Sequence, residues 1–472
     1  MNDFGTPEER KNQVIEFRNQ LNDISPSMCF AKWQQVTMHL GIGHTHSCHH
    51  PSAHKIPIEE VKQNYTALHN TSYKKEQRKL MLEGERPKEC DYCWKVEDSN
   101  SAGTVFSDRI MKSLTPWAKP YADRIANSSY NDDVNPSYLE VSFSSTCNFK
   151  CSYCSPEVSS KWMEEINQHG SYPTSTSFNN IEWLKQSNKM PILEREVNPY
   201  IDAFWQWWPE LYPTLEVLRI TGGEPLLTKN TFKVLDYVLA NPNPKLELNV
   251  NSNLCVPDEL LNKFIDLVKR IQDAGAVGSF KMYTSCEATG ARAEYIRHGL
   301  DYNKWLDNCN RIMREIPNAK LTVISTYNAL SVTSFETFLS DMLKLKIQYS
   351  TDTERNAVGL DIPYLRWPQH QAINILTPDY LQQVENQVTF MYKNMQQTHW
   401  LPLCGKGYYD YDINRMERVY RVFENHLKQG YTMETERKDF AIFIDEHDRR
   451  RGTNFLKTFP EMEEFYRLCK SL

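Results

Sequence analysis

The sequence predicts an α/β fold, and two observations in its central region support this prediction. Between about residues 138 and 363, six short apolar or β-branched runs alternate with longer segments that have the pattern of amphipathic helices. Strands separated by helices pair in parallel through right-handed crossovers, and this pattern alone fits either an open doubly wound sheet or a barrel. The expected strands are 138–143, 215–220, 246–250, 280–284, 321–326 and 357–362, and the helices between them include 231–239, 258–271, 302–314 and 334–345.

The chain of 472 residues is long enough for two or three domains. We expect an N-terminal cysteine-containing module over 1–135, the strand–helix succession over 136–370, and a charged helical region over 371–472. A net charge of −6 without a long basic run argues against a nucleic-acid substrate. No apolar run reaches membrane-spanning length and the first residues lack an apolar signal segment, so we expect a cytoplasmic protein without a membrane partner.

Seven of the twelve cysteines have the spacing of metal ligands. Without a secretion signal, cysteines in such spacings favour metal sites over disulfides. Cys147, Cys151 and Cys154 form a C-x3-C-x2-C run just after the first expected strand. A cubane cluster has four irons, so three thiolates leave one iron open to a ligand that is not protein. A zinc knuckle that lacks its fourth ligand is the alternative.

This cysteine run, with Tyr153 directly before its last cysteine, resembles the radical S-adenosylmethionine (radical SAM) superfamily. The resemblance implies that the three cysteines hold a 4Fe–4S cluster whose open iron chelates SAM. It further implies that reduction of the cluster cleaves SAM to a 5′-deoxyadenosyl radical. The fold that it implies is a partial (β/α)6 TIM-type barrel, with the chemistry at the carboxyl ends of the strands.

The segment Thr221-Gly-Gly-Glu-Pro225 follows the second expected strand. Its two glycines let the backbone approach a ligand closely. In the radical SAM family this segment hydrogen-bonds the amino group of SAM, whereas alone it would be an ordinary turn. For the two asparagines after the third strand, turn formation is the alternative. The SAM-binding residues that the resemblance implies are Gly222, Gly223, Glu224, Asn251, Asn253, Ser285, Glu287, Arg297 and Tyr153.

A second cysteine set, with the spacing C-x18-C-x41-C-x2-C, precedes the barrel region. Four thiolates suit either a fully ligated cubane or a structural zinc, and the spacing does not distinguish them. The stretch 75–94, with a Gly-x-x-Pro turn before its Cys-x-x-Cys pair, resembles the auxiliary-cluster module of the SPASM/twitch subgroup. This implies a second, auxiliary 4Fe–4S cluster, although the subgroup usually places the module after the barrel. The residues of this set are Cys29, Cys48, Cys90 and Cys93.

Strand side chains alternate between the two faces of a sheet, so one face of the expected strands is polar. Its charges, including Glu140 and Arg219, either pair with one another or hold a polar, zwitterionic substrate group such as an amino acid or peptide. The longer polar span 167–198 indicates an insertion near the site mouth, either a lid or a passive surface excursion. Candidate catalytic residues are Lys281 and Tyr283 on the polar face, and Cys286 as a hydrogen-atom donor to a substrate radical.

The resemblance therefore predicts an enzyme that abstracts a hydrogen atom from a peptide or amino-acid-derived substrate. It implies a reducing partner such as flavodoxin or ferredoxin, and an auxiliary cluster that aids oxidation or binds substrate. One alternative is a radical SAM enzyme that modifies tRNA or another nucleic acid, against which the acidic charge argues. The other is a catalytically silent iron–sulfur protein that binds or transfers electrons, against which the intact Gly-Gly-Glu-Pro segment argues.

Overall fold

The computed structural model describes residues 7–99, 105–350, 357–396 and 406–472. The chain has an α/β fold with a mostly parallel sheet, and the hydrogen-bonded strand order is β11-β10-β8-β7-β6-β4-β1-β2-β3. It divides into two compact units, each formed by several segments of the chain. The three-part division predicted from the sequence stays a prediction.

The first unit comprises residues 1–144, 192–222 and 245–248. Its strand β1 pairs antiparallel with β2 and parallel with β4, which in turn pairs parallel with β6. The register places Thr37 opposite Glu140, and Glu140 opposite Arg219, so polar side chains of three strands share one face. These strands are β1 (Gln35–His39), β2 (His44–His46), β3 (His54–Lys55), β4 (Tyr138–Ser142) and β6 (Val217–Thr221).

Several helices of this unit share a buried apolar core. Phe17 and Trp33 lie in a buried apolar cluster that also contains Trp94. Helix α10 packs its aromatic side chains inward, where Phe204 makes an edge-to-face contact with Phe143. The main helices of the unit are α1 (Pro7–Ile24), α2 (Ala31–Gln34), α3 (Ile58–Gln63), α4 (Ser72–Leu82), α5 (Asp91–Asp98), α6 (Asp108–Ser113), α7 (Ala122–Ala126) and α10 (Pro199–Leu211).

The second unit comprises residues 145–191, 223–244 and 249–472. Its strands β8 (Val277–Ser285), β10 (Lys320–Ile324) and β11 (Val358–Asp361) are parallel neighbours. A two-stranded ribbon of β5 (Lys150–Cys151) and β9 (Arg297–His298) sets Cys151 opposite Arg297. The helices that alternate with the strands are α11 (Lys229–Ala240), α12 (Asp258–Asp273), α13 (Gly290–Ile296), α14 (Tyr302–Glu315) and α15 (Phe335–Tyr349).

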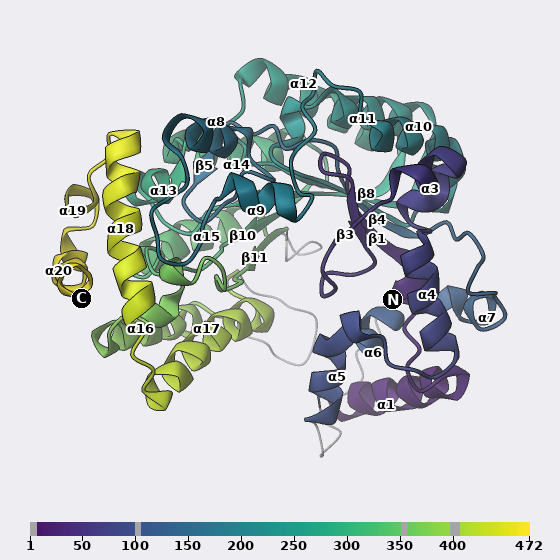
Figure 1. Cartoon of the computed structure of the whole chain (residues 1–472), viewed down its shortest axis with the longest axis horizontal. Helices are drawn as coiled ribbons and strands as arrows, with labels where there is room; N and C mark the ends of the chain where they lie inside the picture. The colour runs from purple at the N-terminus through teal and green to yellow at the C-terminus, as the bar shows by residue number, and fades with distance from the viewer. Residues whose placement is uncertain (1–6, 100–104, 351–356, 397–405) are drawn as a thin grey trace. The chain divides into compact units, whose positions relative to one another are not determined.

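The C-terminal helices of this unit pack against one another, and α16 and α17 lie side by side (Figure 1). A buried ion pair links the C-terminal helix α17 to α15, one of the helices that alternate with the strands. Lys346 Nζ on α15 lies 2.7 Å from Asp412 Oδ2 on α17. None of the helices in the described ranges is long and apolar enough to cross a membrane. The helices of this region are α16 (Leu381–Lys393), α17 (Asp410–Gln429), α18 (Glu434–Arg451), α19 (Phe455–Thr458) and α20 (Glu463–Ser471).

The predicted α/β class is confirmed, and each of the six predicted strands is present. They correspond to β4, β6, β7 (Asn243–Asn251), β8, β10 and β11, which neighbour one another in the order of the chain. The sequence analysis did not predict β1, β2 and β3. β2 and β3 span only three and two residues, which is too short for hydrophobic periodicity to reveal. β1 has five residues, as β4 and β6 do, and its alternating Val36 and Met38 are a signal in the sequence that was missed.

Candidate functional site

The cysteine triplet lies on the segment between β4 and helix α8 (Ser160–His169), which includes the two-residue strand β5 and is called the cysteine loop below. The helix fixes this loop, because Trp162 Nε1 donates a hydrogen bond to the carbonyl of Cys151 at 2.8 Å. The backbone N–H of Cys154 donates to the same carbonyl at 3.0 Å, which forms a tight turn. The three half-buried side chains therefore share one short, anchored segment.

The three thiols are also electrostatic neighbours. Burial raises the pKa of Cys154 to about 12, and Cys151 adds to the rise. Burial likewise raises the pKa of Cys147, with Cys151 as the next cause. Holding all three as thiolates at neutral pH requires nearby positive charge, which a cationic iron–sulfur core supplies. The donor set thus fits the cluster that the family resemblance implies.

Gly223 of the Gly-Gly-Glu-Pro segment packs directly on the loop that carries the cysteines. A Cβ added at this glycine would lie 2.4 Å from the carbonyl oxygen of Thr146 and 2.8 Å from that of Ser145. The next backbone N–H, that of Glu224, donates to the Thr146 carbonyl at 2.8 Å. Gly222 has a φ of +134°, a conformation that favours glycine. The glycines are therefore required for contact between the two motifs.

The carboxylate of Glu224 is buried and holds together the ends of two strands. It accepts hydrogen bonds from Leu226 N at 3.0 Å, Ser252 Oγ at 2.9 Å and Asn253 N at 2.6 Å. Burial raises the pKa of this carboxyl to about 7. Because its oxygens already accept these bonds, the backbone of the segment is better placed than the carboxylate to meet a ligand. The SAM contact predicted for Glu224 stays a prediction.

Asn253 connects the end of β7 to the cysteine loop. Its Nδ2 donates to Asn148 Oδ1 at 2.8 Å, and its Oδ1 accepts from Cys255 N at 2.9 Å. The bond from Cys255 N to Asn253 Oδ1 is a turn-forming arrangement, which is the alternative to a SAM contact for this residue. Asn251 is half-buried at the last position of β7.

Glu287 and Arg297 form a buried pair beside Cys151. The guanidinium donates to both carboxylate oxygens at distances of 2.6 to 3.1 Å, and Nη2 donates to Tyr153 Oη at 2.6 Å. Nη1 lies 3.7 Å from Cys151 Sγ. Burial alone would lower the pKa of Arg297, but Glu287, Tyr153 and Cys151 raise it well above its ordinary value. The guanidinium therefore keeps its charge beside the thiol.

The candidate catalytic residues lie on one face of β8 and directly after its end. Lys281, Tyr283 and Ser285 are half-buried on one face, and Lys281 Nζ lies 5.7 Å from the centre of the Tyr283 ring. Cys286 is fully buried with its Sγ 3.3 Å from the carbonyl of Ala288. Its thiol is close enough to Cys309 on α14 to help raise that residue's pKa, after burial. The hydrogen-donor role predicted for Cys286 stays a prediction.

The cysteine loop has a second anchor, formed by ion pairs of Glu165. Glu165 on α8 pairs with Arg451 on α18 at 3.0 Å and with Lys150 at 2.7 Å. Arg451 Nη1 also donates to the carbonyl of Lys150 at 2.7 Å, next to Cys151. Glu165 and Arg451 are separated by 286 residues and belong to no local motif, so the sequence carried no signal of this clamp.

We expect Glu165→Gln to destabilise the protein at pH 7 and to have little effect near pH 2. Burial alone would raise the pKa of Glu165, but Arg451, Lys150 and Tyr172 lower it to about 2. A carboxyl with a lowered folded-state pKa stabilises the fold above its unfolded pKa of about 4.5 and loses this contribution as the pH falls towards 2. Urea unfolding at pH 7, 5 and 3 should show a loss of about 3 kcal/mol at pH 7 that shrinks on acidification.

Glu164→Gln is the matched control, because this neighbouring carboxylate forms an exposed pair with Lys161 at 2.7 Å. Its effect should stay below about 1 kcal/mol at each pH. An equal loss in the two variants, or a loss at Glu165 that does not change with pH, would contradict the proposed clamp.

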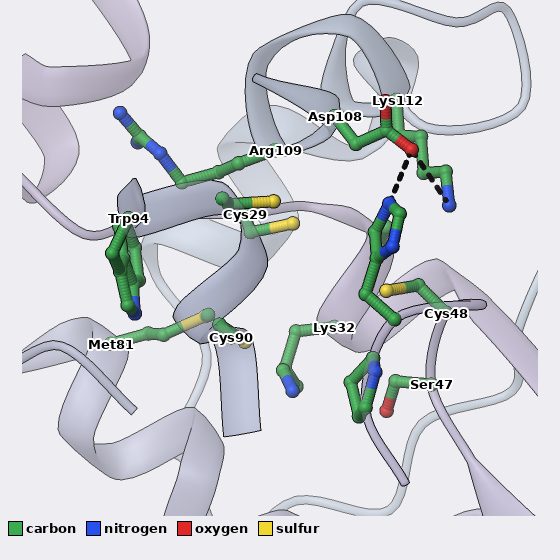
Figure 2. A pocket seen from close by; sticks show the side chains of 14 residues that line it. Cys29, Lys32, Ser47, Cys48, Met81, Cys90, Trp94, Asp108, Arg109 and Lys112 are labelled. Atoms are coloured by element: carbon green, nitrogen blue, oxygen red, sulfur yellow. Dashed lines mark hydrogen bonds and ion pairs between the residues drawn. The ribbon is translucent and has the colours of Figure 1, made fainter. Parts of the chain in front are cut away.

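The N-terminal cysteines line a single cavity of the first unit, although they come from four places in the sequence. Figure 2 shows the thiols of Cys29, Cys48 and Cys90 around this cavity, with the side chain of Lys32 beside them. Burial raises the pKa of Cys90 to about 12, and Cys29 and Cys48 add smaller increases. Cys93 lines the same cavity, and burial and then Cys29 raise its pKa to about 12.

A buried cation accompanies these four thiols. Lys32 is 2% exposed and pairs with Glu89. Burial alone would lower its pKa, but Cys90, Glu89 and Cys48 raise it above the ordinary value. Arg109 also lines the cavity and lies near Cys29, whose pKa it lowers slightly against the rise caused by burial. Four thiols next to fixed positive charge form a donor set that fits a negatively charged tetrathiolate centre.

Across the described ranges, no group of three or more His, Cys, Asp or Glu side chains has the arrangement of a site for one metal ion. Neither a protein-family model nor a curated protein matches this chain. The residues themselves therefore carry the functional argument: two cysteine sites, one in each unit, and a buried polar network around the second of them.

Proposed function

We propose that the chain is a radical SAM enzyme of the SPASM/twitch type. One observation carries this proposal: three motifs far apart in the sequence converge on the cysteine loop. Gly223 packs on Thr146, Asn253 bonds to Asn148, and Arg297 reaches both Cys151 and Tyr153. Gly223 and Asn253 closely follow the ends of β6 and β7, and Glu287, the partner of Arg297, follows the end of β8. Ligands bind at these strand ends in parallel α/β folds.

We place the chemistry in a partial (β/α)6 barrel. The strands β4, β6, β7, β8, β10 and β11 neighbour one another in chain order, as successive β/α units of such a barrel do. Cys147, Cys151 and Cys154 would hold the 4Fe–4S cluster that binds SAM. The backbone of Gly222 and Gly223 would approach the amino group of SAM, while Ser285 and Asn251 stand at the ends of neighbouring strands.

When bound, the cluster supplies the electron that cleaves SAM to methionine and a 5′-deoxyadenosyl radical, which then takes a hydrogen atom from substrate. The chain's own residues hold this chemistry in place. Glu165 and Arg451 fix the cysteine loop from one side, and Gly223 supports it from another. Arg297 adds a fixed positive charge beside Cys151 and orients the Tyr153 hydroxyl.

Cys29, Cys48, Cys90 and Cys93 would hold the auxiliary 4Fe–4S cluster, with Lys32 and Arg109 as fixed counter-charges. We propose a peptide or amino-acid-derived substrate and a cytoplasmic reductant such as flavodoxin or ferredoxin. A polar substrate is supported by Glu140 on β4, whose Oε2 is buried and accepts no hydrogen bond among the described residues. Glu140 Oε2 forms an ion pair with Arg219 Nη1 at 3.7 Å, which is longer than a hydrogen bond.

The test uses anaerobically purified, reconstituted protein. We expect about eight irons per chain and the formation of 5′-deoxyadenosine from SAM and dithionite. The Cys147/Cys151/Cys154→Ala variant should keep about four irons and form no product. Cys255→Ser, which changes a thiol outside both cysteine sets, should leave iron and product unchanged.

Three results would overturn the proposal or a part of it. Deoxyadenosine formation by the triple cysteine variant would exclude the assigned SAM cluster. Zinc together with about four irons in the native chain would make the N-terminal set a structural site. Two full clusters without any deoxyadenosine would instead favour a binding or electron-transfer protein.

A further inference from the structure

A second cavity lies directly beside the third cysteine of the triplet. Its volume is about 480 Å³, and its lining includes Ser155 and Glu157, which follow Cys154 in the chain. The insertion predicted over 167–198 supplies another part of the lining, including Asn179. Asn179 Nδ2 donates to the carbonyl of Cys154 at 3.2 Å, so the cavity wall is tied to the cysteine loop. The insertion is thus part of a cavity next to the proposed SAM cluster.

Two large aromatic side chains line this cavity and remain accessible to solvent. Trp183, on α9 (Ile181–Gln186) of the insertion, is 49% exposed, and Trp367 is 53% exposed. Tryptophan is costly to leave in water and is enriched where proteins bind partners. Two half-exposed tryptophans in one cavity therefore indicate a surface that another group covers.

The cavity already holds one cationic group of its own. Lys189 Nζ lies 4.9 Å from the centre of the Trp183 ring and 3.4 Å from Glu157 Oε1. An aromatic face combined with a carboxylate is the arrangement that binds ammonium and guanidinium groups. Lys189 belongs to the insertion, where it follows α9, and occupies this arrangement as an internal ligand.

The contact made by Lys189 leaves the carboxylate incompletely satisfied. Glu157 Oε2 is buried and has no hydrogen-bond partner among the described residues. The bond at 3.4 Å to Oε1 is long for a charge-assisted hydrogen bond, and the Lys189 side chain is 27% exposed. A partly exposed ion pair of this kind contributes little to stability, so another cation can replace Lys189 at small cost.

We propose that this cavity binds a basic side chain, lysine or arginine, of a peptide substrate. The cation would lie on Trp183 and bond to Glu157, with Lys189 displaced towards solvent and Trp367 covering the aliphatic stem. This inference rests on the proposed function, because it assumes that the substrate is a peptide. It adds a recognition element at the cysteine loop, through which a basic residue anchors the peptide beside the site of hydrogen abstraction.

Binding of capped, fluorescein-labelled pentapeptides to the full chain tests this inference without SAM or reductant. The probes are Gly-Ser-Lys-Ser-Gly and the same peptide with acetyllysine, which removes the charge. We expect the lysine peptide to bind about tenfold more tightly, measured by fluorescence anisotropy. Glu157→Gln should remove this preference, whereas Lys189→Met should strengthen binding of the lysine peptide several-fold because it vacates the site.

The exposed Glu182–Lys185 pair on the same helix, 2.8 Å apart, provides the matched control. Glu182→Gln and Lys185→Met should leave both affinities unchanged. Three results would overturn the proposal. They are equal binding of the two peptides to the native protein, weaker binding of the lysine peptide to Lys189→Met than to the native protein, and no binding of the lysine peptide to either of these two proteins. The binding assay needs neither SAM nor reductant, so a failure to form 5′-deoxyadenosine would not change its result. Conversely, a failure of peptide binding would leave the test of SAM cleavage unaffected.

Discussion

Gly223→Ala is expected to displace the loop that carries Cys147, Cys151 and Cys154. The added methyl group would meet the backbone oxygens of Thr146 and Ser145 at 2.4 and 2.8 Å, well inside van der Waals contact. Both obstacles are backbone atoms, so no side-chain rotation relieves the clash, and the loop must move. We expect a loss of at least about 1–3 kcal/mol in the free energy of unfolding, measured by urea unfolding. Reconstituted protein should also lose about four irons.

Gly359→Ala on β11 is the control for this prediction. A Cβ at this position would lie 3.2 Å from the Thr322 hydroxyl, which is the end of a side chain. The free energy of unfolding should change by less than about 1 kcal/mol, and the iron content should not change. If Gly223→Ala matched the native protein in stability and iron content, the packing of the glycine segment on the cysteine loop would be refuted.

Glu287→Gln is expected to have the second large effect. Glu287 is 1% exposed, and its carboxylate accepts hydrogen bonds from both Nε and Nη2 of Arg297. Replacing this carboxylate by a neutral amide leaves the buried guanidinium without its counter-charge. Removing one partner of such a pair costs about 3–5 kcal/mol. Arg297 would also lose the partner that directs it towards Tyr153 and Cys151. Deoxyadenosine formation should therefore fall along with the unfolding midpoint.

A similar ion pair near the surface gives the comparison. Arg292 Nε and Nη2 bond to the Glu461 carboxylate at 3.0 and 2.9 Å, but both side chains are 32% exposed. Glu461→Gln removes the same charge from a similar geometry and should cost no more than about 1 kcal/mol. Equal losses in Glu287→Gln and Glu461→Gln would mean that burial does not decide the strength of the inner pair.

The combined variant Glu287→Gln/Arg297→Met separates stability from function. Replacing both partners of a buried pair by uncharged groups recovers much of the lost stability, because no charge remains buried without a partner. If product formation stays low while stability returns, Arg297 acts on the cysteine loop as a positioning residue. If product formation returns with stability, the pair serves only the fold.

Several features of this protein followed from its sequence alone. Six runs of apolar residues became β4, β6, β7, β8, β10 and β11, because hydrophobic periodicity is a local property of the chain. The cysteine spacings and the Gly-Gly-Glu-Pro segment are local as well, and they were sufficient to locate the loop at Cys147–Cys154 and the turn after β6.

Other features depended on contacts between residues distant in the sequence. Tertiary packing directs the carboxylate of Glu224 to Ser252 and to the backbone of Asn253, and the sequence carried no signal of these two hydrogen bonds. The Glu165–Arg451 clamp spans 286 residues, and the Glu157–Lys189 pair meets Trp183 only where the insertion folds back beside the cysteine loop. Local pattern decides which segments become strands, helices and ligand-bearing loops. The energy of burying charge decides which side chains pair, and that depends on neighbours that only the folded chain brings together.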